Sequence, residues 1–336
     1  MTAVPADHTY VLVQNSGAER VLLVDLAAKR STEVVRFERE LTSRRSVALT
    51  ESADGRALAI LERIDASVLL HVVRPITGEV RTLPQPADVD TAAISPDGTR
   101  VAIARVSTDF AANGLWLAAV DGSAPARLVG LRSDRTGPPP RPRAWSPDGR
   151  WLAVSASIGT DLNEIVVVDT TAGETIFDPS LNSFSGGDAR LVEAANDAEW
   201  SAGGLIFWTS RGPFGAPPTV SSYDLIAGST TELYEAKADQ SILDARLRPG
   251  TRQIAVLQAP FAATLTTPRA IVLVERGVTP RALRDVGFGA RMWWSPDGAR
   301  LDVRTGDDST GTITDVFGTW GTMAFCLRGG DAPPCL

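Results

Sequence analysis

The tetrapeptide Ser95-Pro96-Asp97-Gly98 recurs as Ser146-Pro147-Asp148-Gly149 and Ser295-Pro296-Asp297-Gly298, each time between two apolar runs. Less regular copies are Ser52-Ala53-Asp54-Gly55, Ser201-Ala202-Gly203-Gly204 and Arg248-Pro249-Gly250. The final glycines of successive copies lie 43 to 55 residues apart. One turn signal in every 40–50 residues or so indicates a repeat architecture of radially arranged or stacked units.

The tetrapeptide has the chemistry of a hairpin turn. Proline presets φ near −65° at its second position, aspartate bonds its local backbone, and glycine takes the left-handed conformation that realigns the two strands. Short β-branched or aromatic runs flank each copy, as in 91–94 before Ser95 and 100–104 after Gly98. The tetrapeptides therefore predict antiparallel hairpins.

Two further strands follow in most repeats. Third strands are expected at 68–73, 115–120, 165–168 and 271–274, and fourth strands at 79–83, 126–129 and 231–234. Four antiparallel strands in each repeat are typical of a β-propeller blade. The predicted fold is an all-β propeller, most simply of seven four-stranded blades, with six as the alternative.

The hairpins followed by Arg-Leu-Ala-Val-like strands resemble the repeats of TolB-like, WD-repeat-like propellers over about residues 47–305. The resemblance implies a propeller that recognises a protein or peptide partner. Because such propellers are typically exported in bacteria, it also favours the periplasm or the extracellular space over the cytoplasm, although residues 1–8 lack the pattern of a secretory signal.

The repeats divide the chain into a leader at 1–9 and one propeller domain at 10–336. Blades are expected near 10–46, 47–90, 91–141, 142–196, 197–242, 243–289 and 290–336. The first blade has only three predicted strands, and a strand at 323–327 is expected to complete it. Closure of this kind would remove exposed sheet edges.

Composition narrows the classes of partner. The net charge of −7 disfavours binding to nucleic acid or to anionic membranes, and no uninterrupted apolar window of about 18 residues predicts a membrane span. Nothing in the sequence indicates oligomerisation, so a monomer is expected.

Cys326 and Cys335 flank a turn-rich spacer. They form either a disulfide, which would favour an oxidising compartment, or two free thiols.

Catalytic groups are scarce. His8 lies in the leader and His71 in an apolar run, so a Ser-His-Asp hydrolase and a histidine-rich metal site are not expected. The turn aspartates are interpreted as turn formers rather than metal ligands. The acidic stretch 306–311 is expected to be an exposed loop. No cofactor is predicted, with Ca²⁺ as the one possible ion.

Tryptophan recurs one residue before the hairpin serine, at Trp145, Trp200 and Trp294. This equivalence predicts wedges between neighbouring blades rather than a ligand platform. Trp293 is one residue earlier and is therefore expected to point to the opposite face of its strand.

The links between blades are expected to gather charged residues at the channel mouth, where the first strands begin. The candidate binding residues are Asp90, Arg143, Asp197, Glu199, Asp244, Arg246, Arg291 and Trp293. Either they bind a ligand or they seal the channel through mutual ion pairs. The long links 131–143, stiff and proline-rich, and 182–197, read as a flexible loop, could form a rim of the same surface.

The sequence thus predicts a non-catalytic scaffold that binds a protein or peptide at the channel-mouth face. The alternative is a propeller enzyme of the lyase, lactonase or hydrolase type, with an acidic and possibly Ca²⁺-dependent site at the same place.

Overall fold

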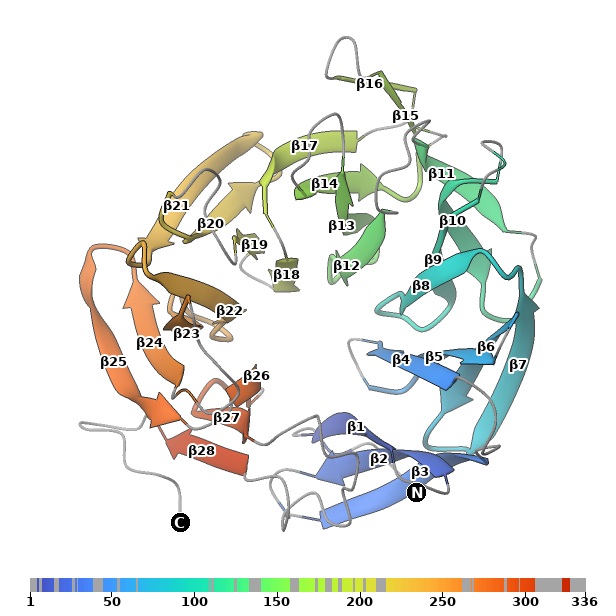
Figure 1. Ribbon diagram of the computed structural model, residues 1–336, viewed down its shortest axis with the longest axis horizontal. Helices are drawn as coiled ribbons and strands as arrows, with labels where there is room; N and C mark the ends of the chain where they lie inside the picture. The colour runs from blue at the N-terminus through green and yellow to red at the C-terminus, as the bar shows by residue number, and fades with distance from the viewer. Residues whose placement is uncertain are drawn as a thin grey trace. The chain divides into compact units, whose positions relative to one another are not determined.

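The computed structural model describes residues 5, 8–14, 18–25, 28, 30–38, 45–52, 55–64, 66–107, 109, 112–123, 126–132, 140–157, 163–172, 175–178, 183–186, 189–195, 197–201, 204–209, 216–261, 267, 269–286, 289–295, 297–305 and 322–326. All regular structure in this part of the chain is β-strand (Figure 1). A helix able to cross a membrane is accordingly absent from the described ranges. The chain forms two compact units, Met1–Ala194 and Ala195–Leu336.

The first unit contains four sheets. Their strands are β1 His8–Gln14, β2 Ala18–Asp25, β3 Arg30–Glu38; β4 Arg45–Glu51, β5 Leu58–Ile64, β6 Ser67–Arg74, β7 Glu79–Gln85; β8 Val89–Ile94, β9 Arg100–Arg105, β10 Gly114–Ala119, β11 Arg127–Arg132; and β12 Arg141–Trp145, β13 Trp151–Ser157, β14 Asn163–Asp169, β17 Ala189–Ala194. Within each of these groups, consecutive strands pair antiparallel. Buried aliphatic side chains of neighbouring sheets form shared cores.

The second unit contains three sheets. Their strands are β18 Asp197–Ser201, β19 Gly204–Trp208, β20 Thr219–Asp224, β21 Ser229–Glu235; β22 Gln240–Leu247, β23 Ile254–Pro260, β24 Arg269–Glu275, β25 Val278–Val286; and β26 Gly289–Trp294, β27 Arg300–Thr305, β28 Thr322–Cys326. The strand runs expected from the sequence at 91–94, 100–104, 271–274 and 231–234 all fall within these strands or those of the first unit, which confirms the all-β prediction.

The tetrapeptides form the predicted turns. Gly98 has φ of 67° and its N–H donates to Ser95 O at 2.9 Å. The Ser95 hydroxyl donates to Asp97 Oδ1 at 2.5 Å, and Asp97 accepts a second bond from the Thr99 N–H. The same serine–aspartate bond recurs in the other two clean copies. These aspartates are turn formers, as expected.

The tryptophans before the hairpins join neighbouring sheets. Trp145 is 9% exposed, and its Nε1 donates to the carbonyl of Ala93 in the preceding sheet at 3.3 Å. Trp294 donates in the same way to Arg246 O at 3.0 Å. The wedge prediction is confirmed for both. The indole N–H of Trp200 is buried without a hydrogen-bond partner among the described residues, so its role stays a prediction.

One predicted strand pairing and one predicted loop were wrong. The run expected to complete the first sheet is β28, which pairs with β27 instead, from Arg300↔Cys326 to Arg304↔Thr322. The link 182–197, expected to be a flexible loop, contains β17 and also β16 Ser183–Gly186. Strand β16 forms a hairpin with β15 Thr175–Asp178, and β15 adds in parallel to β11 of the preceding sheet (Figure 1). A four-residue strand in a polar segment leaves little periodicity for sequence reasoning to detect.

The turn glycines allow a first prediction. A Cβ at Gly98 would lie 2.8 Å from the Cβ of Ala57, whereas a Cβ at Gly250, with φ of 69°, would meet no atom within 4 Å. Gly250→Ala should therefore lose only the cost of left-handed backbone, about 1–2 kcal/mol. Gly98→Ala should lose about 1–3 kcal/mol more, because the added methyl group overpacks the turn. Denaturant unfolding measures both, and equal losses would contradict the packing assigned to Gly98.

Candidate functional site

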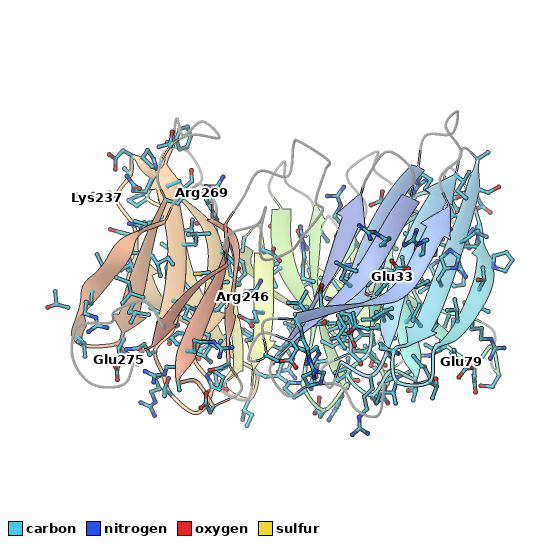
Figure 2. All side chains as sticks on the ribbon, turned by 90° about the horizontal axis from the view of Figure 1, so that it is seen from below. Glu33, Glu79, Lys237, Arg246, Arg269 and Glu275 are labelled. Carbon is cyan, nitrogen blue, oxygen red and sulfur yellow. The ribbon has the colours of Figure 1, made fainter. Side chains whose placement is uncertain are left out.

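Predicted site residues come together on the first strands of two adjacent sheets of the second unit. Asp197 and Glu199 lie on β18, and Asp244 and Arg246 lie on β22. In each pair the residues are two apart, so alternation along the strand places their side chains on one face of it. Figure 2 shows Arg246 part-way along its sheet, between the end that carries Lys237 and the end that carries Glu275.

The Arg246 guanidinium joins the two strands. Its Nη1 lies 3.5 Å from Glu199 Oε1, and its Nε lies 3.1 Å from Asp244 Oδ1. The side chains of Arg246 and Glu199 are 27% and 25% exposed, so solvent reaches both. Glu199 Oε2 is buried and has no hydrogen-bond partner among the described residues. One guanidinium thus lies beside more carboxylates than its single positive charge can neutralise.

Burial and the neighbouring charges together shift two pKa values. Burial raises the pKa of the Glu199 carboxyl to about 7; Arg246 opposes this shift, while the Asp244 carboxylate adds to it. Burial alone would lower the pKa of Arg246, but the carboxylates of Asp244, Glu199 and Asp197 raise it above its ordinary value. Arg246 therefore stays charged, and Glu199 exchanges its proton near neutral pH.

Asp244 has a structural role as well. Its side chain is 4% exposed, and Oδ2 accepts a hydrogen bond of 2.9 Å from the N–H of Met292 on β26. Asp244 therefore connects the β22–β25 sheet to the next sheet. The sequence places it at the start of its strand, whereas β22 begins four residues earlier, at Gln240. Its contacts with Arg246 and with the Met292 N–H make Asp244 a positioning residue for Arg246.

Sequence reasoning missed Leu243. The pairing of β22 with β23 shifts between Ile242 and Asp244, which leaves Leu243 as the extra residue of a β-bulge. Its side chain is 38% exposed. Asp90 occupies the same kind of bulge on β8. Bulges re-aim side chains and are common next to functional sites, but no sequence signal marks them here.

The predicted residues of the first unit form a separate arrangement. Asp90 Oδ2 lies 3.6 Å from Nε of Arg141, which begins the first strand of the next sheet. Arg143 is half-buried at a bulge in β12. Arg141 is therefore an ion-pair partner of Asp90.

Some predictions lie outside the described part of the structure. The backbones of Arg291 and Trp293 belong to β26, but their side chains are not described, and neither is Cys335. The middle of the 131–143 link and the acidic 306–311 stretch are also outside it. Within the described ranges, no three His, Cys, Asp or Glu side chains gather as metal ligands.

His71 is a packed strand residue, as the sequence predicts. It is 6% exposed, its Nε2 lies 2.6 Å from Glu62 Oε2, and its Nδ1 lies 3.0 Å from Thr82 Oγ1. Its ring packs against Phe37 with the centroids 4.9 Å apart. The imidazole thus holds a polar connection through the interior of the β4–β7 sheet.

Comparisons with known proteins identify the fold. No family model matches the sequence, and no curated protein matches it. Among solved structures, a prolyl endopeptidase superposes with a TM-score of 0.68 at 14% identity, over 98% of this chain and 48% of its own. The chain thus spans about half the length of that enzyme.

Two further solved structures extend the likeness. A protein assigned as TolB from Agrobacterium tumefaciens superposes with a TM-score of 0.53 at 16% identity, over 84% of this chain and 96% of its own. An oligogalacturonate lyase in complex with manganese gives 0.58 at 10%, over 99% and 85%. Together with the repeated antiparallel sheets, these likenesses show a TolB-like β-propeller fold.

Proposed function

We propose that the chain is a non-catalytic β-propeller scaffold that binds a protein or peptide through Asp197, Glu199, Leu243 and Arg246. The observation that carries the proposal is the convergence of Glu199 and Arg246 from adjacent sheets, both partly open to solvent. The same strand β22 also carries an exposed leucine, Leu243. Arginine is enriched at protein-binding surfaces, which combine an apolar core with a polar rim.

The proposal includes finer features of the fold. Seven blades in one closed domain would bring Asp90, Arg143, Arg291 and Trp293 to the same channel mouth. We also propose a monomer in the periplasm or outside the cell, with the cytoplasm as the alternative. Protein partners of TolB-like propellers support the choice of ligand only by analogy of fold.

A photo-crosslinking residue at position 197 should identify the partner in the cells that make the protein. The same residue at position 230, on the outer strand β21, provides the matched control. A protein captured from position 197 and absent from position 230 would support the proposed surface. Equal capture from both positions would contradict it.

A second candidate function is an enzyme. Glu199 has a pKa of about 7 and lies 3.5 Å from a guanidinium, an arrangement suited to general acid–base catalysis. The likeness to the oligogalacturonate lyase suggests oligogalacturonate as the substrate to test, with Mn²⁺ or Ca²⁺ added. Formation of an unsaturated product by the wild type, abolished in Glu199→Gln, would favour this candidate over the scaffold.

A further inference from the structure

A second arginine of the β22–β25 sheet is held in a fixed position at the hairpin end. The Arg248 guanidinium lies over the Trp294 ring, 5.4 Å from its centroid. Its Nε donates to Gly298 O at 2.7 Å, and its Nη1 donates to Gln253 Oε1 at 2.9 Å. The Nη2 group has no hydrogen-bond partner among the described residues. Within the described part of the chain its N–H donors are therefore available, and they are already oriented.

Arg248 forms one wall of a cavity of about 330 Å³. The other lining residues are Gln253, Leu273, Glu275, Val278, Thr279 and Arg281. Figure 2 shows Glu275 at the end of the sheet opposite Lys237 and Arg269, so the Glu275 side of the cavity lies at that end. The volume is at the lower end of the range for small-molecule pockets.

Arg127 in another sheet shows which contacts an arginine at the position of Arg281 can make. Arg127 on β11 pairs with Leu117, as Arg281 on β25 pairs with Leu273. Arg127 donates from Nη1 and Nη2 to two backbone carbonyls of the next sheet's turn, those of Ala172 and Thr170. Arg281 is exposed and has no such acceptor within the described ranges.

We propose that the cavity binds an anionic group, a carboxylate or a phosphate, between Arg248 and Arg281. Such a group would accept hydrogen bonds from the guanidinium groups of both arginines. Planar guanidinium groups match the geometry of carboxylate and phosphate oxygens, and a preoriented guanidinium loses little freedom on binding. Leu273 and Val278 add an apolar wall for the rest of the ligand.

Calorimetric titration with inorganic phosphate and with succinate tests the proposal and distinguishes the two ligand chemistries. The wild type should bind at least one of them saturably, and Arg281→Ala should bind it about tenfold or more weakly. Arg281→Lys should retain part of the affinity. Arg276→Ala is the matched control, because Arg276 is an exposed arginine of the same hairpin that does not line the cavity.

Circular dichroism of each variant checks that the fold is retained. Absence of saturable binding of either anion to the wild type would overturn the proposal. Unchanged binding in Arg281→Ala, or an equal loss in Arg276→Ala, would overturn it as well. None of these outcomes bears on the Glu199–Arg246 site.

Discussion

Replacing Trp145 with alanine should lower the free energy of unfolding by about 3–5 kcal/mol. The indole is 9% exposed and fills the space between two sheets, donating to Ala93 O at 3.3 Å. The Arg100 guanidinium covers the ring, 5.3 Å from its centroid. The change would leave a cavity between the two sheets and remove the ring beneath the Arg100 guanidinium.

Urea unfolding of Trp145→Ala and Trp145→Phe measures the effect. Phenylalanine keeps most of the apolar volume, so Trp145→Phe should lose only about 1–2 kcal/mol, the hydrogen bond to Ala93 included. Trp116 is the control, because it is only half-buried and its indole bonds within its own sheet, to Ala112 O. A loss below about 1 kcal/mol in Trp145→Ala would contradict the wedge.

Glu199→Gln should stabilise the protein above neutral pH. The folded-state pKa of about 7 is above the ordinary value of 4.5. Below pH 4.5 the carboxyl is protonated in both the folded and the unfolded state, so Glu199 does not destabilise the folded state. As the pH rises from 4.5 to 7, ionisation favours the unfolded state, and the cost is complete above pH 7.

The expected gain at pH 8 is about 1–3 kcal/mol, the full shift reduced for partial exposure, and it should be much smaller at pH 5. Arg246 keeps Asp244 and so is not left unpaired. Thermal unfolding at both pH values checks this, with exposed Glu232→Gln as the control. Destabilisation of Glu199→Gln at pH 8 would instead mean that the ion pair with Arg246 outweighs the burial of the carboxylate.

The hairpins could be predicted from sequence because their determinants are local. Ser95, Asp97 and Gly98 specify the turn by themselves, and tryptophan at a fixed distance from it showed the contact between sheets. The pairing of β28 could not be predicted in this way. A short apolar strand can pair with any free edge, and only the packed structure decides which edge it takes.

The candidate site was predictable to a similar extent. Sequence spacing placed Glu199 and Arg246 on equivalent strands, and the structure brings them into contact. The buried bond from Met292 to Asp244 and the exposure of Leu243 depend on a bulge and on tertiary packing, for which the residues carry no signal. The place of Arg281 in a cavity wall depends on tertiary packing as well, and no sequence signal marks it.

The affinity for the captured partner tests the central claim most directly. At pH 8, where Glu199 is largely ionised, Asp197→Asn/Glu199→Gln removes two charges from the site. Glu232→Gln/Glu235→Gln removes two from the exposed strand β21 of the same sheet. Both pairs change net charge equally and preserve side-chain shape. The account predicts a dissociation constant about tenfold higher or more for the first pair and unchanged for the second. Equal affinities for both pairs and the wild type would contradict recognition through the Glu199–Arg246 site.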